Sequence, residues 1–367
     1  MPLVENVSGN VIANCIQGRT QRSMKIYTIK DIARKAGVSV TTVSRVLNHR
    51  PDVNSTTREK VERVMAAYHF VGNANARGLK QADSDMAAII LRGHQNPFLN
   101  GLAEAMLQAA SISKTAFMLE FIDEKADEFQ TALRLFHEKR VKGFIFVGSR
   151  IDDRCKALAG LDTPFVFATV AAADASVPNA SSVAIDDRAM GYLAAKTLLD
   201  QGHRKIAIFG GLRDLGDSLS LRYSGALEAF HDCGLVFDES RYVETRFSLK
   251  GAYDCARAFF ARKSDTTAVF AMSDTVAMGI IRALKDMGRR VPEDVSIFGF
   301  DGIEMGKYFI PRLTTIEQPV EQIARASVEV LLDMLEHGGA PRHVAVDAVL
   351  RLRESVKEPP ESQGGQG

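Results

Sequence analysis

Residues Tyr27 to Asn48, YTIKDIARKAGVSVTTVSRVLN, predict two short helices around a tight turn. Apolar residues of the first helix recur at helical spacing and form one face, made of Ile29, Ile32, Ala33 and Ala36. Gly37 is expected to end this helix, and Ser39 is a natural N-cap for the next one. A helix-turn-helix of this kind fits its second helix into the major groove of DNA.

The second helix is expected to bury Val43, Val46 and Leu47 and to turn its polar side chains outward. Short polar side chains with one arginine suit base edges and phosphates. We expect bases to be read by Thr41, Thr42 and Arg45, a thymine methyl group to meet Val40, and phosphates to bind Tyr27, Ser39 and Ser44, while Asn48 completes the set of expected DNA-binding residues.

A third helix is expected to begin at Ser55, with Val61, Val64, Met65 and Tyr68 at helical spacing. Charge is concentrated here: residues 25–80 hold 11 Lys/Arg against 4 Asp/Glu, a net +7, whereas the whole chain carries +1. The remainder therefore carries about −6, and the positive field lies where a duplex would bind.

The composition is that of an ordinary globular protein. With 367 residues the chain is long enough for two or three domains, and it is 46% hydrophobic and 25% charged. No apolar run approaches the roughly 20 residues of a membrane span. The four cysteines are scattered without metal-ligand spacing, which favours a reduced, cytoplasmic setting; they are Cys15, Cys155, Cys233 and Cys255.

From Met86 onward, short apolar runs alternate with amphipathic segments. The expected strands form two series, 88–91, 117–121, 144–147 and 165–169, then 183–185, 205–209, 268–271 and 295–300. The expected helices are 99–111, 128–139, 188–200, 223–231, 252–261, 276–287 and 320–336, before a closing strand at 346–352. This alternation predicts an α/β fold of two lobes with parallel sheets, and a ligand cleft between the lobes at the carboxyl ends of the strands.

Several runs resemble the lactose-repressor/galactose-repressor (LacI/GalR) family. The headpiece matches are AGVS at 36–39, TVSRVLN at 42–48 and TREKV at 57–61. Later matches are NPF at 96–98, GHRKIA at 202–207, Arg222 with Gly225, SD at 273–274, GFD at 299–301, PRLTTI at 311–316 and QP at 318–319, so the resemblance covers nearly the whole chain. It implies an N-terminal three-helix helix-turn-helix headpiece and a two-lobed core like that of a periplasmic binding protein.

The resemblance also implies a function. It suggests a homodimeric, sequence-specific DNA-binding transcription regulator that represses carbohydrate-utilisation genes. Such a repressor would be released from a palindromic operator when a small sugar-like effector binds between the lobes. The expected segments are a disordered extension at 1–25, the DNA-binding domain at 26–72, a hinge at 73–83, the effector-binding and dimerisation core at 84–356, and a disordered tail at 357–367.

The hinge of the family becomes helical on operator DNA and wedges a leucine into the minor groove. By resemblance, Leu79 is that leucine, and Lys80 is a phosphate or minor-groove contact. Gly72 stands where the family usually has proline, and Gly78 costs a hinge helix roughly 1 kcal/mol relative to alanine. A plain flexible linker is the alternative.

In the cleft, Arg222 offers a planar fork of donors, and Asp301 offers a carboxylate for vicinal hydroxyls, so together they suit a polyol. A salt bridge of either residue to a neighbour is the alternative. The remaining expected effector-binding residues, taken from family positions, are Phe98, Thr169, Phe247, Ser273 and Gln318. Arg246 is the alternative to Phe247 for contact with the effector. Arg92 and His94 either bind an acidic substituent of the effector or are solvated loop residues.

Other chemistry finds no support in the sequence. No metal-ligand spacing or phosphate-binding glycine loop occurs, Asp186 and Asp187 are expected to cap a helix, and neither an enzyme nor a cofactor is expected. Two alternatives stay open: a purine- or nucleoside-responsive regulator, with inducer or corepressor logic, and a sugar-binding solute receptor without a DNA function.

Overall fold

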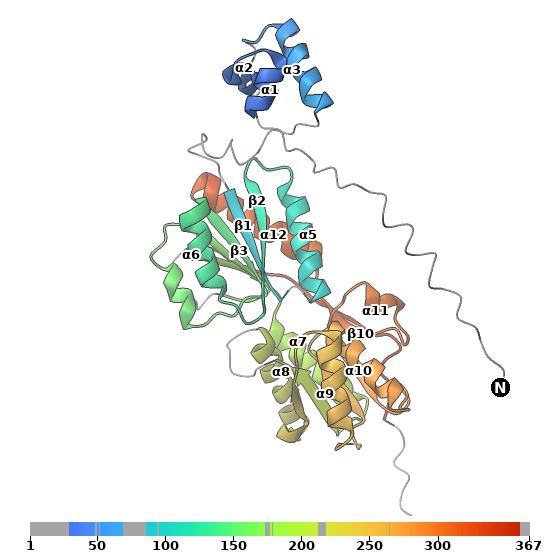
Figure 1. Cartoon of the computed structure of the whole chain (residues 1–367). Coiled ribbons are helices and arrows are strands. Elements are labelled where there is room, and N and C mark those ends of the chain that lie inside the picture. Colours follow the sequence, from blue (N-terminus) through green and yellow to red (C-terminus); the bar gives the residue numbers. More distant parts are fainter. Residues whose placement is uncertain are drawn as a thin grey trace, which may run out of the picture. The chain divides into compact units, whose positions relative to one another are not determined.

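The computed structural model describes residues 29–47, 50, 52–68, 86–93, 95–172, 177, 179–211, 218–263 and 265–359. The chain divides into two compact units, Met1–Asp83 and Ser84–Gly367 (Figure 1). The expected extension at 1–25 and hinge at 73–83 lie outside the described residues, as does most of the expected tail. Hydrogen bonds continue as far as Lys357, whose amide donates to Ser296 Oγ at 3.0 Å.

The described residues of the first unit form three helices, α1 (Ile29–Ala36), α2 (Val40–Leu47) and α3 (Ser55–Ala67). Their buried residues are those expected from helical spacing: Ile32, Ala33, Ala36, Val43, Val46 and Val61. Leu47, Val64, Met65 and Tyr68 are partly buried against this cluster. The three-helix headpiece expected from the sequence is therefore present.

The turn between α1 and α2 follows from two residues. Gly37 adopts φ 61°, a left-handed conformation that favours glycine at the end of a helix. Ser39 then caps α2, because its Oγ accepts a hydrogen bond from the Thr42 amide at 3.0 Å. Helix α3 begins at Ser55 as expected, and Asn54 caps it, since its Oδ1 accepts from the Thr56 amide at 2.8 Å.

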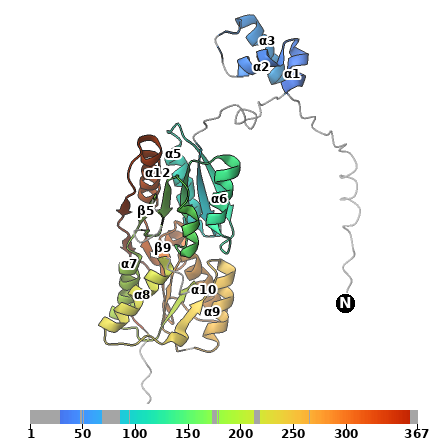
Figure 2. The same cartoon turned by 90° about the vertical axis from the view of Figure 1, so that its left-hand side faces the viewer.

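Lobe 1 of the second unit is built on a parallel sheet in the order β11-β5-β4-β3-β1-β2. Its strands are β1 (Met86–Arg92), β2 (Ala116–Ile122), β3 (Gly143–Val147), β4 (Phe165–Ala168), β5 (Ala180–Ala184) and β11 (His343–Ala345). Helix α12 (Val320–His337) covers one face together with α5 (Pro97–Ala110), and α6 (Glu128–Lys139) covers the other (Figure 2). A short 3-10 helix, η1 (Asp153–Leu158), packs beside α6.

Lobe 2 has a sheet in the order β12-β10-β9-β8-β6-β7, parallel except for the pairing of β10 with β12. Its strands are β6 (Ile206–Gly210), β7 (Tyr242–Glu244), β8 (Ala268–Ala271), β9 (Ser296–Asp301), β10 (Thr314–Glu317) and β12 (Val349–Arg351). Helices α7 (Asp187–Asp200) and α8 (Ser218–Asp232) lie on one face, and α9 (Leu249–Phe260) and α10 (Asp274–Asp286) on the other (Figure 2). The short elements α11 (Met305–Tyr308) and η2 (Glu239–Arg241) complete the lobe.

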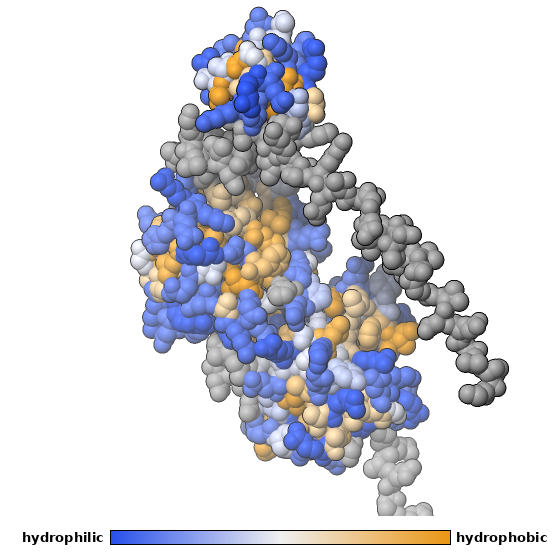
Figure 3. Space-filling view, in the orientation of Figure 1, coloured by the Kyte–Doolittle hydropathy of each residue, from blue (hydrophilic) through white to orange (hydrophobic). Residues whose placement is uncertain are grey.

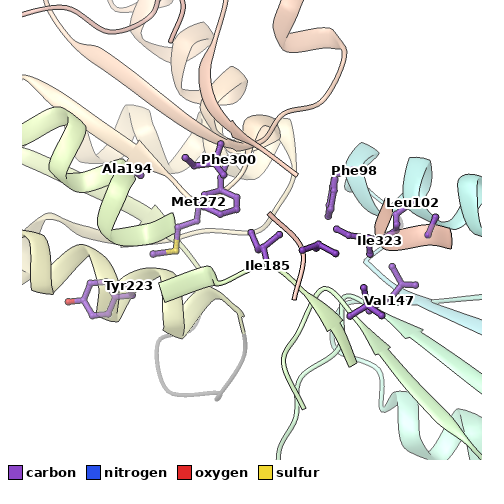
Figure 4. Close-up of a cluster of buried hydrophobic side chains, with 14 of the residues drawn as sticks. Phe98, Leu102, Val147, Ile185, Ala194, Tyr223, Met272, Phe300 and Ile323 are labelled. Carbon is purple, nitrogen blue, oxygen red and sulfur yellow. The ribbon is translucent and has the colours of Figure 1, made fainter. Parts of the chain in front are cut away.

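The chain passes between the lobes after β5, after β10 and after β11. One buried apolar cluster continues across this junction (Figure 4). In that view Phe98 and Val147 lie on the lobe 1 side, Met272 and Phe300 on the lobe 2 side, and Ile185 between them. The two lobes therefore share one hydrophobic core at the junction between them.

The predicted α/β fold of two lobes with parallel sheets is confirmed. Most strands expected from the apolar runs lie within a few residues of the observed ones. The strands β7, β10 and β11 were not expected, because each is short and includes polar or charged residues, so no continuous apolar run marks it.

Candidate functional site

The outward face of α2 is the candidate DNA-reading surface. Val40, Thr41 and Arg45 are exposed, whereas Thr42 and Ser44 are half-buried. The Ser39 hydroxyl lies 2.8 Å from the Thr42 hydroxyl. This arrangement leaves the exposed side chains of one helix face available to an external duplex.

Arg45 already has a partner on the headpiece. Its Nη1 lies 3.5 Å from Asp52 Oδ2, with the two side chains 55% and 56% exposed. An ion pair this exposed contributes little to stability, so the guanidinium can leave it for a base edge at small cost. The other expected DNA contacts, Tyr27, Asn48, Leu79 and Lys80, lie outside the described residues.

In the second unit, a cleft lies between the lobes at the carboxyl ends of their strands. The space at this cleft, counted together with the adjoining open solvent, is about 990 Å³. Lobe 1 contributes the loops after β1, β2, β3 and β4, and lobe 2 contributes the first turns of α8, the segment before α9 and the end of β9. Five of the seven expected effector-binding residues line it together: Phe98, Thr169, Arg222, Phe247 and Asp301.

Arg222 is held on the wall of lobe 2 by several contacts. Its Nε donates to Asp187 Oδ1 at 2.8 Å, its Nη1 donates to the Met272 carbonyl at 2.9 Å, and its guanidinium stacks 3.6 Å from the centroid of the Phe300 ring. Asp301 Oδ1 lies 3.9 Å from Nη1. Arg222 therefore forms the salt bridge to a neighbour that was the alternative expectation. Its guanidinium also lines the cleft.

The expectation that both Asp186 and Asp187 cap a helix is wrong for Asp187. The cap of α7 is Asp186 alone, whose Oδ1 accepts from the Ala189 amide at 2.9 Å. Asp187 is 2% exposed and turns toward Arg222. Sequence reasoning missed this role because the two residues are 35 positions apart and only the packing of α7 on α8 brings them together.

Two glycines allow this close packing. A Cβ at Gly225 of α8 would collide with the Arg188 carbonyl of α7, and a Cβ at Gly191 of α7 would collide with the Arg222 carbonyl of α8. The helices therefore touch backbone to backbone where Arg222 begins its reach toward Asp187. This contact fixes the position of the guanidinium.

Asp301 ends β9 with φ 108°, a conformation that costs free energy for a residue other than glycine. Gln318 Nε2 donates to its Oδ1 at 2.9 Å. Burial raises the pKa of Asp301 to about 7, although Arg222 and the side chains of Gln318 and Asn96 favour the ionised form. A carboxyl with this pKa can donate or accept a hydrogen bond near neutral pH.

Asp274 supports the loop that follows Asp301. Its two oxygens accept from Thr315 Oγ1 at 2.6 Å and from the Ile303 amide at 2.8 Å. Burial, reinforced by the charge of Asp301, raises the pKa of this carboxyl well above its usual range. The residue does not line the cleft, so its role is to position the end of β9.

Ser273 and Gln318 do not line the cleft. Ser273 is fully buried at the start of α10, and its Oγ has no hydrogen-bond partner among the described residues. Gln318 lines a separate groove on the other side of Phe98 and Asp301, so it reaches the cleft only through its hydrogen bond to Asp301.

Arg92 is neither a solvated loop residue nor a free cation. It is 8% exposed at the end of β1; its Nε and Nη2 donate to the Gly148 carbonyl at 2.9 and 2.6 Å, and its Nη1 donates to the Glu124 carbonyl at 3.2 Å. One guanidinium thus joins the loops after β1, β2 and β3. His94 lies outside the described residues.

Several polar residues of the cleft were not expected. They share a position just after a strand or at a helix start, and they are Gln95, Asn96, Asp123, Glu124, Ser149, Arg150 and Ser218. The signal that would have found them is that position, because parallel strands gather their carboxyl ends at one edge. Arg246, the rival of Phe247, lines the cleft beside it, and its Nε lies 3.3 Å from Glu124 Oε1.

Among the described residues, no group of three or more His, Cys, Asp or Glu side chains is arranged to hold a metal ion. The described helices also include none that is long and apolar enough to cross a membrane.

Two family models match the chain. Residues 28–73 match the family "Bacterial regulatory proteins, lacI family", and residues 196–356 match the "Periplasmic binding protein-like domain". These matches coincide with the headpiece and with most of lobe 2 and the last elements of lobe 1.

Similar proteins extend the match to nearly the full length. The transcriptional regulator MalR of Clostridium butyricum is 32% identical over 330 residues, which cover 89% of this chain and 98% of that protein. The transcriptional repressor PurR of Erwinia tasmaniensis is 32% identical over 84% of this chain and 90% of its own. Among solved structures, a complex of the transcriptional regulator CelR with cellobiose is 27% identical with a TM-score of 0.67, and the match covers 90% of this chain and 100% of that one.

Proposed function

This chain belongs to the lacI family of bacterial regulatory proteins and is a DNA-binding transcription regulator, and from that premise we propose that it represses carbohydrate-utilisation genes in response to a sugar. The effector binds in the cleft between the lobes. Its binding releases the protein from a palindromic operator. The protein acts where its DNA lies, in the cytoplasm.

The observation that carries the proposal is the pair formed by Arg222 and Asp301 on the cleft wall. Their side chains lie 3.9 Å apart and present donors and acceptors side by side, as vicinal hydroxyls require. Phe98 and Phe247 line the same cleft and offer apolar faces to the C–H side of a sugar ring. A cleft with a few polar groups among apolar ones is the usual form of a small-molecule site.

On the DNA side, we propose that α2 enters the major groove with Val40, Thr41, Thr42 and Arg45 toward the bases. Ser39 and Ser44 hold phosphates on either side. We also propose DNA contacts by four residues outside the described part of the chain: Tyr27 and Asn48 from the helix-turn-helix sequence, and Leu79 and Lys80 from the family resemblance.

Two copies are needed to read a palindrome, and one face of the core suits this pairing. Figure 3 shows apolar residues gathered on the side of lobe 1 that carries β2 and α5, and again around α11 of lobe 2. Exposed side chains there include Phe121 at 55%, Met305 at 55%, Tyr308 at 77% and Ile310 at 89%. Exposed apolar area of this kind is typical of an interface, so we propose that the dimer forms here.

The effector acts by binding one arrangement of the lobes better than another. Because the cleft is lined from both lobes, a ligand that contacts Arg222 and Phe98 together favours the arrangement in which they face each other. The same change alters the dimer face, since both lobes carry part of it. Operator affinity then depends on the ligand through the dimer.

The test uses DNA retardation with the full chain and a palindrome selected from a random duplex library. Addition of the matching sugar should release the DNA. The variants Arg222→Ala and Asp301→Ala should bind DNA as the wild type does but ignore the sugar, and Arg282→Ala, an exposed residue of α10 away from the cleft, should respond normally. Normal release in both cleft variants would show that the effector binds elsewhere.

A purine-responsive regulator is the second candidate, because PurR is as similar in sequence as MalR. The same assay distinguishes the two: release or tightening by a purine base or nucleoside, with no effect of sugars, would favour the purine reading. Tightening instead of release would indicate a corepressor.

A further inference from the structure

Helix α2 is about as long as the groove that it is expected to enter is wide. Its eight residues rise about 12 Å along the helix axis, and the major groove of B-DNA is about 12 Å across. A recognition helix turns its N-terminal residues toward the base edges. The opposite end of α2 is therefore expected at the rim of the groove, where the phosphates lie.

Arg50 is fixed close to this end of α2 by two backbone hydrogen bonds. Its amide donates to the Arg45 carbonyl at 3.0 Å, a bond that closes the C-terminal turn of many helices. Its carbonyl accepts from Nη2 of Arg58 on α3 at 2.5 Å. Arg58 is half-buried and ties the end of α2 to α3. The backbone of Arg50 is therefore already held in place in the free protein.

Asp52 shows on which side of the headpiece this segment lies. Its Oδ2 is 3.5 Å from Nη1 of Arg45, an exposed residue of the candidate DNA-reading surface. Arg50, two residues before Asp52, is exposed as well, and no other described residue offers its side chain a hydrogen bond or an ion pair. Its guanidinium is therefore available to an external anion next to that surface.

Arg50 also counters a repulsion that Asp52 would create on DNA. When Arg45 leaves Asp52 for a base edge, the Asp52 carboxylate stays beside a polyanion without its partner. Like charges at this distance repel each other, most strongly at low salt. A guanidinium two residues away offsets this repulsion and can form two parallel hydrogen bonds with a phosphate.

A second role for Arg50 would involve α2 alone. A cation near the C-terminal end of a helix interacts favourably with the helix dipole. That interaction stabilises the free protein, whereas a phosphate contact releases counterions and increases the salt dependence of DNA binding. The two roles therefore change different measurable quantities.

We propose that Arg50 binds a DNA phosphate at the rim of the major groove and that Arg58 is the residue that positions it. The contact adds affinity for any duplex and carries no base preference, because every nucleotide step presents the same phosphate. In a dimer each half-site receives one such contact. The inference rests on the proposed entry of α2 into the major groove.

The experiment is a fluorescence-anisotropy titration of the full chain against the selected palindrome and against a random duplex. It is repeated at several KCl concentrations between about 50 and 200 mM, the range in which phosphate contacts dominate the salt dependence. The variants are Arg50→Gln, Arg50→Lys, Arg58→Gln and the double variant with both glutamines. The control is Arg282→Gln, on α10 of the second unit, and thermal unfolding of every variant is measured in parallel.

Arg50→Gln should reduce the slope of log Kobs against log salt by about 0.9 for each subunit and weaken both duplexes by the same factor. Arg50→Lys should keep the slope, because an ammonium group also binds phosphate. Arg58→Gln should weaken both duplexes less than Arg50→Gln does. It should have no further effect in the Arg50→Gln background, because it acts through Arg50. The control should behave as the wild type.

An unchanged slope in Arg50→Gln would overturn the proposal, and a lower unfolding temperature in the same variant would assign Arg50 to the helix end alone. A loss confined to the palindrome would also overturn it, since Arg50 would then read a base. Equal effects of Arg58→Gln in both backgrounds would remove its positioning role. A failure of the proposed function differs from all of these: the wild type would bind no palindrome more tightly than the random duplex.

Discussion

Arg222 and Asp187 form an ion pair inside lobe 2, with Nε 2.8 Å from Oδ1 and the two side chains 6% and 1% exposed. The pair joins the start of α7 to the start of α8 at the wall of the cleft. It holds the guanidinium in the orientation from which it also approaches Asp301. The geometry of the candidate site thus depends on a carboxylate that does not line the cleft.

Replacing Asp187 should therefore affect both stability and ligand response. Asp187→Ala leaves the buried guanidinium without its main partner and should lower the free energy of unfolding by about 3–5 kcal/mol. Asp187→Asn retains a hydrogen-bond acceptor and should cost less. Urea denaturation measures both, and equal stability of wild type and Asp187→Ala would contradict this role.

The pKa of about 7 predicts a pH dependence for Asp301. The folded pKa lies above the unfolded value of about 3.9, so the stability that this group contributes is complete below pH 4 and is lost as the pH rises through 7. Asp301→Asn should flatten that part of the profile of unfolding free energy against pH. A profile that is identical in the variant would show that Asp301 is not the group responsible.

The backbone contact between α7 and α8 predicts that Gly225→Ala is destabilising although alanine favours helices. The new methyl group would meet the Arg188 carbonyl, and overpacking of this kind costs about 1–3 kcal/mol. Gly101→Ala in α5 is the matched change, because a Cβ there meets no atom within 4 Å, and it should gain roughly 0.5–1 kcal/mol. Thermal unfolding of both variants checks the pair, and the same sign of change in both would contradict the steric argument.

On the headpiece, Arg45→Ala should weaken operator binding by roughly 1–3 kcal/mol and relax preference at one base position. Asp52→Ala removes the intramolecular partner of Arg45 but not the reading group, so it should leave the preference unchanged. Titration of each variant against operators changed one base pair at a time measures both effects. Unchanged affinity and preference in Arg45→Ala would remove it from the reading face.

Much of this architecture could be predicted from sequence because it follows local periodicity. Helical spacing identified the apolar core of the headpiece, and alternating runs identified the two lobes. Arg222 and Asp301 could be placed at the cleft because they follow strands or begin helices at its edge.

The remaining features depend on packing between distant segments. Asp187 meets Arg222 only through the glycine contact of α7 with α8, and Arg92 is buried only because the carbonyls of Gly148 and Glu124 converge on it. Ser273 was expected in the cleft by family position, but its short side chain ends in the protein interior. No local pattern carries such information.

The order of the strands has a consequence for synthesis. The sheet of lobe 1 ends with β11, which lies more than 150 residues after its neighbour β5, and lobe 2 ends with β12 a few residues later. The chain must therefore have left the ribosome through Ala345 before lobe 1 can acquire its last strand, and through Arg351 before lobe 2 can. The two lobes should therefore complete their folding at nearly the same time.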